Sequence, residues 1–306
     1  MTDRFPSDAR FAFTVVDDTD LATAENVKPV YDLLAKLGMR TTKTLWPLAA
    51  TEANPYAGSQ TAADPGYRSF LRNLHASGFE LALHGVRMHS SPRADVEAGL
   101  ERFTEYFDAG PSLHVNHFKN LDNIYWGRSR LSGRLAGAAY RVAAGMHSSL
   151  GHVPGSPYFW GDICRERIRY VRSFTLRETN LDRLPAPIAY SDSDRPFARR
   201  FFLSTEGGNL PAFVDALTED KQDALAAQGG VCIMYAHFGA GFVEHGALNK
   251  RFATLMRRLA GLGGWFPPTS ELLDRLYPDD PPAISRRQRD AIERRWLLER
   301  LRYGSS

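Results

Sequence analysis

The sequence places acidic residues and histidines at the ends of several short apolar segments. Asp17 and Asp18 end the first such segment, His84 ends the third, and His237 follows a late one. The carboxyl ends of parallel strands meet on one face of a βα protein, and active sites lie on that face. If these segments are parallel strands, carboxylates and imidazoles from distant parts of the chain meet at one site.

A metal site is the first chemistry that these residue types predict. One carboxylate and two imidazoles are a common ligand set for Zn²⁺ and leave a coordination position for water. We expect Asp18, His84 and His89 to supply this set, with Asp17 facing the bound water as a general base. The alternative is structural: the aspartates would cap a helix, His84 would end the sheet, and His89 would be an exposed loop residue.

His237 is the candidate general acid, because an imidazole with its ordinary pKa of about 6.5 can protonate a leaving amine. The glycines that follow it, at 239, 241 and 246, do not have the spacing of a dinucleotide-binding loop. Trp46 and Trp126 are candidates to stack on a sugar ring, and both could equally belong to the core.

The elements that must position these residues form a repeating pattern. Short apolar runs alternate with amphipathic stretches along the 306 residues, which predicts a parallel sheet closed, or nearly closed, into a βα barrel. The expected strands are 10–18, 41–48, 79–84, 113–118, 168–175, 200–204 and 231–236. The expected helices are 25–37, 65–77, 92–107, 210–227 and 249–262.

The charge distribution sets the last segment, residues 284–306, apart from the rest. The formal net charge is +3, and this segment has seven arginines against three acidic residues, so the remainder is close to neutral. A near-neutral body argues against nucleic-acid binding. We expect a basic amphipathic helix packed on the domain, with contact to a membrane surface or an anionic partner as the alternative. Its apolar residues on one side are Ile292, Trp296, Leu297 and Leu301.

The sequence predicts a cytoplasmic protein. Residues 1–10 lack the apolar core of a secretory signal. No apolar run approaches the roughly 20 residues that span a bilayer, so we expect no transmembrane segment. Cys164 and Cys232 are too few for a disulfide framework or a thiolate metal site.

Taken together, the motifs resemble those of the NodB-homology polysaccharide deacetylases, carbohydrate esterase family 4. The shared features are an aspartate pair ending a strand near the N-terminus, a His-Gly…His segment after the third strand, and a late strand ending in histidine before glycine. The resemblance covers residues 10–275. It implies an α/β fold, a distorted (β/α)7 barrel, which we expect over residues 1–280. The sequence pattern itself predicts a basic C-terminal helical extension over residues 281–306.

The resemblance also implies a divalent metal, Zn²⁺, in an Asp-His-His site. Asp17 matches the catalytic base, Asp18 the metal aspartate, His84 and His89 the metal histidines, and His237 the general acid. The family separates its histidine pair by three residues, whereas four lie between this pair. His117 is therefore the alternative ligand.

The family's Arg-Pro-Tyr-Gly-like segment has no clear counterpart here, and the segment 114–120 takes its approximate place. This departure indicates a divergent branch of the family. We expect its polar residues to orient the base or bind substrate, together with Trp46 and Trp126. These polar residues are Asn116, His117, Lys119 and Asn120.

The predicted function is metal-dependent removal of an N-acetyl group from an N-acetylated carbohydrate. The expected compartment favours a carrier-linked glycan precursor over a finished wall polymer. The alternatives are another amide hydrolase on the same scaffold, such as a deformylase or a cyclic amidase, and a catalytically inactive carbohydrate-binding barrel.

Overall fold

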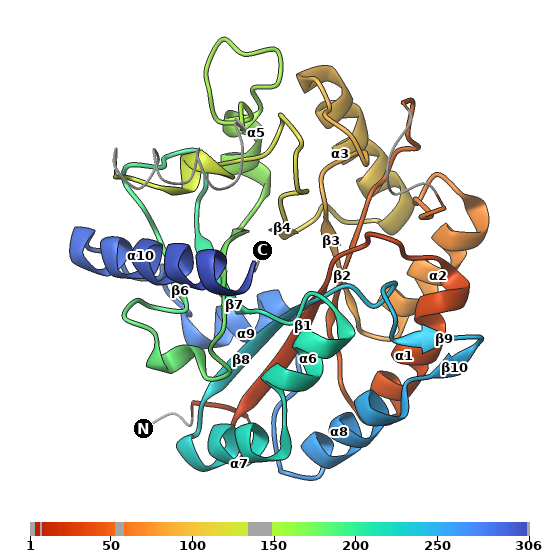
Figure 1. Cartoon of the computed structure of the whole chain (residues 1–306). Helices are drawn as coiled ribbons and strands as arrows, with labels where there is room; N and C mark the ends of the chain where they lie inside the picture. The colour runs from red at the N-terminus through yellow and green to blue at the C-terminus, as the bar shows by residue number, and fades with distance from the viewer. Residues whose placement is uncertain (1–3, 7, 53–57, 134–148, 305–306) are drawn as a thin grey trace.

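The computed structural model describes residues 4–6, 8–52, 58–133 and 149–304. Within them, seven parallel strands form a closed ring in the order β1-β2-β3-β4-β5-β7-β8, with β8 pairing back onto β1 (Figure 1). The strands are β1 (Ala12–Asp17), β2 (Thr42–Leu45), β3 (Glu80–Leu83), β4 (Leu113–His114), β5 (Tyr170–Leu176), β7 (Phe201–Thr205) and β8 (Val231–Ala236). The predicted barrel is therefore confirmed, and it has seven strands.

The ring is irregular. β4 has only two residues, the pairing between β5 and β7 shifts register between Arg172 and Thr175, and β6 (Ala189–Tyr190) adds to β7 in the antiparallel sense. A two-stranded hairpin, β9 (Val243–Glu244) and β10 (Ala247–Leu248), lies outside the ring. The barrel is thus of the distorted (β/α)7 kind.

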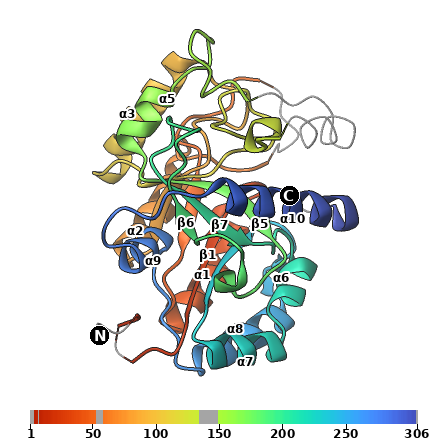
Figure 2. The ribbon, with the colours of Figure 1, turned by 90° about the vertical axis from the view of Figure 1, so that its left-hand side faces the viewer.

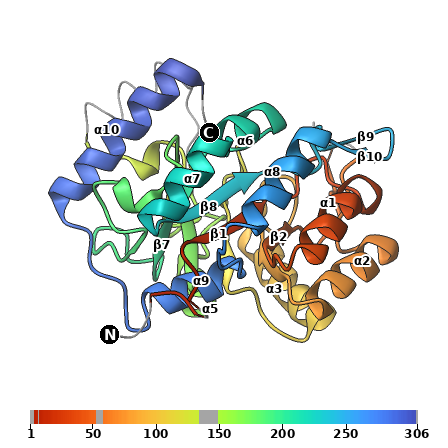
Figure 3. The ribbon, with the colours of Figure 1, turned by 90° about the horizontal axis from the view of Figure 1, so that it is seen from below.

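Helices surround the strands, as the views from the side and from below show (Figures 1 and 3). They are α1 (Ala24–Lys36), α2 (Pro65–Ala76), α3 (Arg93–Phe107), α5 (Gly161–Arg167), α6 (Leu210–Ala216), α7 (Glu219–Gln228), α8 (Lys250–Ala260), α9 (Thr269–Leu276) and α10 (Arg286–Tyr303). Two short 3-10 helices are η1 (Arg128–Arg130) and η2 (Leu181–Arg183). No helix of the described residues is long and apolar enough to span a membrane.

The helix expected over 210–227 is divided into α6 and α7. Leu217, between them, is buried and has a non-helical backbone. The carbonyls freed by the break are satisfied by side chains: Lys221 Nζ donates to the Asp215 carbonyl, and Gln222 Nε2 donates to the Leu217 carbonyl. These local bonds favour a break that apolar periodicity alone does not reveal.

Side chains of β1 alternate between two parts of the core. Phe13 and Val15 pack with residues of α1 and α8, whereas Ala12 and Val16 pack with residues of β2, β3 and β5. This is the period of two that a strand imposes. The next two residues of the chain are aspartates, and the same alternation decides where each one points.

The C-terminal helix α10 packs across the barrel beside β5 and β7 (Figure 2). Ile292 and Trp296 are buried, and the Trp296 ring lies 5.6 Å from the ring of Phe174 in β5. Leu297 is half-buried, but Leu301 is exposed. The expected packing therefore holds for the middle of the helix and not for its last turn.

Candidate active site

Three histidines from separate strand ends meet around the carboxylate of Asp20. Asp20 lies in the loop after β1, His84 follows β3, His117 follows β4, and His237 follows β8. The Nε2 atoms of the histidines lie 3.1, 2.8 and 3.1 Å, respectively, from the Asp20 carboxylate oxygens. Asp20, His84 and His117 are buried, and His237 is partly exposed. We call these four residues the Asp–His cluster.

The outer ring nitrogens of two histidines of this cluster, His117 and His237, contact acceptor oxygens. His237 Nδ1 lies 2.7 Å from the Gly208 carbonyl oxygen, which can only accept, so Nδ1 carries the hydrogen. His117 Nδ1 faces the Asn120 side-chain oxygen at 3.4 Å. A neutral imidazole that donates from Nδ1 presents a lone pair at Nε2. His117 Nε2 faces an Asp20 carboxylate oxygen at 2.8 Å, so a cation shared by these two groups would satisfy both sides.

The donor set fits a divalent metal. One ligand atom from each of Asp20, His84 and His117 lies within 4.8 Å of the others, and all three residues are buried. Two imidazoles and a carboxylate are ligands that Zn²⁺ accepts, and outer hydrogen bonds such as that of His117 commonly hold metal histidines in place.

The charges of the Asp–His cluster depend strongly on one another. Burial raises the pKa of Asp20, but His84, His117 and His237 outweigh it and hold this pKa well below its usual range. Burial lowers the pKa of His84. Burial also opposes the charge of His237, but its hydrogen bond to Asp20 and the charges of Asp18 and Asp20 raise its pKa to about 9.

Asp18 enters the same space from the end of β1. Its two oxygens accept hydrogen bonds from Arg172 of β5 at 2.9 and 2.5 Å, a two-pronged pairing that fixes the carboxylate plane. Asp18 Oδ2 is also 4.0 Å from His84 Nε2. Asp18 therefore lies beside the Asp–His cluster. It is not in the group of Asp20, His84 and His117, but it forms a second possible ligand group with Asp20 and His237.

The structure corrects the expected placement of Asp17. Its side chain is fully buried on the α1 side of β1, where it pairs with Lys43 Nζ at 2.9 Å and accepts from the Tyr31 hydroxyl at 2.8 Å. Its other oxygen accepts from the Phe238 backbone N–H at 2.8 Å. Strand alternation turns Asp17 away from the site and Asp18 toward it, so Asp17 does not face the cavity.

The structure also corrects the expected placement of His89. Its Nε2 atom accepts a hydrogen bond from the Thr51 backbone N–H at 3.0 Å, and its Nδ1 atom lies 3.1 Å from the Ser90 carbonyl oxygen. Gly85, with φ of 75°, turns the chain immediately after β3 and directs the segment that bears His89 elsewhere. His117, the alternative ligand, takes the place beside His84.

The other predicted residues have mixed positions. Trp46 is fully buried, and its ring lies 5.7 Å from the ring of His84 and 5.4 Å from that of His117, so it packs behind these histidines. Asn116 lines the cavity. Its amide group also bonds the backbone of Ile124 at 2.8 and 3.0 Å.

Three of the predicted substrate-binding residues lie at or near the rim. Trp126 lines the main cavity, whereas Lys119 and Asn120 line a small neighbouring pocket with it. Lys119 Nζ lies 5.1 Å from the ring centroid of the exposed Phe118. Asn120 is buried, and its contact with His117 gives it a positioning role.

Asp20, His84 and His237 of the Asp–His cluster line a cavity of about 450 Å³. Asp18, Arg172 and residues of α10 also line this cavity. The sequence alone gave no indication that α10 would do so. The lining residues are Asp18, Asp20, Leu21, His84, Asn116, Phe118, Trp126, Gly127, Arg130, Arg172, Thr175, Tyr235, His237, Ala240, Trp296, Arg300 and Gly304. A second cavity, of about 420 Å³, shares part of this lining, including His237 and Gly304.

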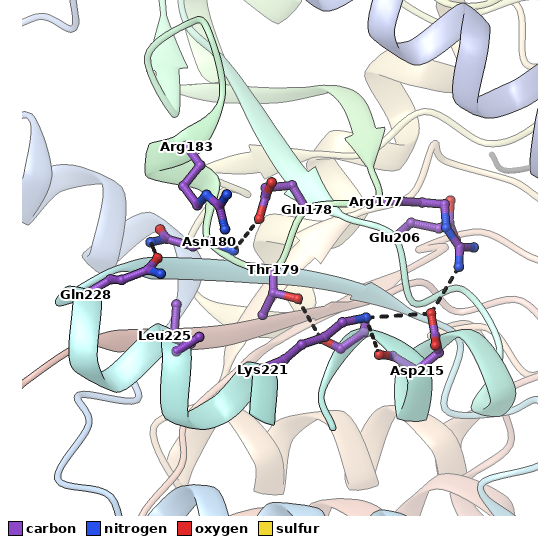
Figure 4. A pocket seen from close by; sticks show the side chains of 12 residues that line it. Arg177, Glu178, Thr179, Asn180, Arg183, Glu206, Asp215, Lys221, Leu225 and Gln228 are labelled. Atoms are coloured by element: carbon purple, nitrogen blue, oxygen red, sulfur yellow. Dashed lines mark hydrogen bonds and ion pairs between the residues drawn. The ribbon is translucent and has the colours of Figure 1, made fainter. Parts of the chain in front are cut away.

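A separate pocket of about 210 Å³ lies beside α7 (Figure 4). Three of its charged side chains pair with one another: Asp215 Oδ2 is 3.0 Å from Arg177 Nη2 and 3.7 Å from Lys221 Nζ. No residue of the Asp–His cluster lines it. The chemistry therefore belongs to the cavity at the barrel mouth.

No protein-family model matches the sequence, and no curated protein matches it either. Solved structures do match. A "putative polysaccharide deacetylase" from Mycobacterium smegmatis is 12% identical with a TM-score of 0.52, over 92% of this chain and 96% of that chain. A "probable polysaccharide deacetylase" from Pseudomonas aeruginosa PAO1 and the Puue allantoinase each match at 12% identity and a TM-score of 0.52, over 91% of this chain and 94% of theirs. The chain therefore shares the fold of the polysaccharide deacetylases.

Proposed function

We propose that this protein is a metal-dependent hydrolase that removes the N-acetyl group from an N-acetylated sugar or a carrier-linked glycan precursor. The observation that carries this proposal is the convergence of Asp20, His84 and His117, with Asp18 and His237 beside them. All of these residues except His117 line one cavity. The fold shared with polysaccharide deacetylases supports it.

Asp20, His84 and His117 would hold the metal, and Zn²⁺ suits this donor set. When bound, a divalent ion supplies Lewis acidity that polarises an amide carbonyl and lowers the pKa of water. Burial of all three ligands limits competition from bulk water.

Asp18 takes the role of general base that the sequence assigned to Asp17. Its carboxylate lies within 4.0 Å of His84 Nε2, at the edge of the proposed ligand set. Arg172 holds its orientation, and a carboxylate retains lone pairs beyond the two that Arg172 engages. Asp18 is thus placed to accept a proton from a water molecule that attacks the amide carbon.

His237 takes the role of general acid. Its Nδ1–H donates to the Gly208 carbonyl, which fixes the ring with Nε2 toward the Asp–His cluster and the cavity. A proton on Nε2 can pass to the nitrogen of the departing sugar amine as the C–N bond breaks. Base and acid thus come from β1 and β8, which are neighbours in the barrel.

A product screen tests this function. We expect the zinc-loaded protein to release acetate from at least one N-acetyl sugar, free or carrier-linked, with no formate from N-formyl analogues and no opening of cyclic amides. The Asp18→Asn variant, in the same assays, controls for contaminating hydrolases. Release of acetate at equal rates by wild type and variant would contradict the proposed site.

The second candidate is a cyclic amidase, which the shared fold of the Puue allantoinase favours. Ring opening of a cyclic amide without acetate release would support it over deacetylation. Binding of N-acetyl sugars with no hydrolysis of any amide would instead indicate a carbohydrate-binding barrel.

A further inference from the structure

The C-terminal helix α10 has two sides of different chemistry. Its inner side packs on the barrel through the buried Ile292 and Trp296. Its outer side faces solvent, and the view from below shows the helix at the edge of the molecule (Figure 3). Residues three, four or seven positions apart share a helix face, so five exposed side chains form one line along this outer side. We call this line the α10 stripe, and its residues are Arg287, Arg294, Leu298, Leu301 and Arg302.

The arginines of α10 are divided between these two sides. Arg289 and Arg295, which point toward the barrel, both form ion pairs with acidic residues. Arg287 and Arg294 of the α10 stripe form no ion pair with any residue that the structure describes. The Arg302 guanidinium carbon lies 5.9 Å from the ring centroid of Tyr303, a contact that leaves its charge uncompensated.

The acidic residues of α10 do not neutralise the stripe. Glu293 is buried and bonds Ser132, and Glu299 accepts a hydrogen bond from Arg295. Asp290, which is half-buried, is then the acidic residue of the helix that lies beside the stripe. The three arginines of the stripe therefore outweigh it, and the outer side of α10 is positively charged.

The outer side of α10 is also apolar near its end. Leu298 and Leu301 lie one helix turn apart, and each is 67% exposed. Among the described residues six large hydrophobic side chains are exposed, and five of them lie at the end of α10 or in the lining of the main cavity: Leu298, Leu301, Tyr303, Leu21 and Phe118. Gly304, which ends α10, lines that cavity too. The exposed apolar surface is therefore concentrated near the cavity mouth, and such a concentration marks an interaction site.

Leucines among unpaired arginines suit the surface of an anionic membrane. The guanidinium groups bind lipid phosphates, while the leucines and the arginine alkyl chains enter the boundary between headgroups and acyl chains. An acidic protein would match the arginines but would offer no apolar partner to the leucines. The charge of the whole chain is concentrated in residues 284–306, so attraction to an anionic surface acts through this helix.

We infer that the α10 stripe docks on an anionic lipid membrane, with Leu298 and Leu301 inserted at the level of the headgroups. Because the last turn of α10 lines the main cavity, docking brings the cavity mouth close to the membrane surface. The inference goes beyond the proposed reaction and does not depend on it, because the stripe contains no residue of the Asp–His cluster.

Co-sedimentation of the full chain with vesicles tests the docking. One kind of vesicle is pure phosphatidylcholine, and the other contains equal parts of phosphatidylcholine and phosphatidylglycerol. We expect binding to the phosphatidylglycerol vesicles to be tighter by about tenfold or more, because each arginine near an anionic surface adds to the attraction. Added salt should weaken this binding by screening the charges.

Two double variants separate the charged and the apolar contributions. Arg287→Gln with Arg294→Gln removes two charges, and Leu298→Gln with Leu301→Gln removes two apolar side chains. Each double variant should weaken binding to the phosphatidylglycerol vesicles by about tenfold or more. All four side chains are exposed, so circular dichroism should show a wild-type fold for both.

Arg167→Gln with Arg199→Gln is the matched control, because it removes the same charge from another face. Both residues are exposed, and they precede β5 and β7, respectively. They therefore lie at the end of the barrel opposite the strand ends that bear the Asp–His cluster. This control should bind the phosphatidylglycerol vesicles as tightly as wild type.

Several results would overturn the inference. They are equal binding to both kinds of vesicle, binding to neither, unchanged binding in either double variant of α10, or an equal loss in the control. A dimer seen by analytical ultracentrifugation, dissociated by Leu298→Gln with Leu301→Gln and without affinity for vesicles, would assign the stripe to a second copy of the chain instead. Failure of the proposed reaction would change none of these results, because no hydrolysis is measured.

Discussion

Replacing Asp18 by asparagine is expected to lower kcat for amide hydrolysis about 10²- to 10⁴-fold, the range contributed by a positioned general base. Asparagine keeps the shape of the side chain and an oxygen acceptor for Arg172, but it cannot take a proton from water. Asp20, His84 and His117 are untouched, so zinc content measured by elemental analysis should match wild type. The measurement is kcat on the best substrate, normalised to bound zinc.

The comparison of Asp18 with Asp17 makes this prediction specific. A folded Asp17→Asn variant should retain more activity than Asp18→Asn, since Asp17 contacts Lys43, Tyr31 and the Phe238 backbone rather than the cavity. If Asp18→Asn were fully active and Asp17→Asn inactive with normal zinc and normal folding, the assignment of the base would be reversed.

Replacing Asp17 by alanine is expected to lower the free energy of unfolding by about 3–5 kcal/mol, the cost of leaving a buried charge without its partner. Lys43 is fully buried with Asp17. Burial alone lowers the pKa of Lys43, but the charge of Asp17 outweighs this effect and raises it. Chemical denaturation followed by fluorescence measures the change.

The double variant Asp17→Leu with Lys43→Met is the control for this prediction. Replacement of a buried ion pair by apolar residues of similar volume is often close to neutral, so the double variant should be more stable than Asp17→Ala. If Asp17→Ala lowered the free energy of unfolding by less than about 1 kcal/mol, the ion pair would contribute less to stability than its burial suggests.

The barrel could be predicted because its signal is local. Each strand is a short apolar run and most helices have clear caps, so alternation along the chain was enough to reveal the βα pattern. The strand predicted over 113–118 is too long, because β4 ends at His114. The residues that follow bond within their own loop instead of with a neighbouring strand. The Asn116 amide bonds the Ile124 backbone, and the His117 N–H donates to Asn123 Oδ1. His117 thereby turns toward Asp20.

The site was predicted in part, for geometric reasons. His84 and His237 lie where strand ends converge, so their meeting followed from the fold. Asp20 was not among the predicted site residues, yet its spacing of two from Asp18 puts both on the same side of an extended chain. That alternation was the available signal, and it also separates Asp17 from Asp18, both of which the sequence analysis had placed at the site.

The role of α10 in the cavity could not be read from the sequence. The helix was expected to pack through Ile292 and Trp296, and it does. Its placement over the barrel mouth depends on contacts such as Glu293 with Ser132, which lie 161 residues apart. Pairings of this kind have no local signature, so the part of the cavity lining that α10 supplies emerged only from the structure.

The central claim is that Asp20, His84 and His117 hold one catalytic metal ion. Anomalous diffraction at the zinc edge, on crystals of the zinc-loaded protein, tests it most directly. We predict one strong peak within bonding distance of an Asp20 oxygen and the Nε2 atoms of both histidines, about 2.0–2.2 Å from each. A peak at His89 or Asp17, or none at Asp20 when zinc is in excess, would contradict the account.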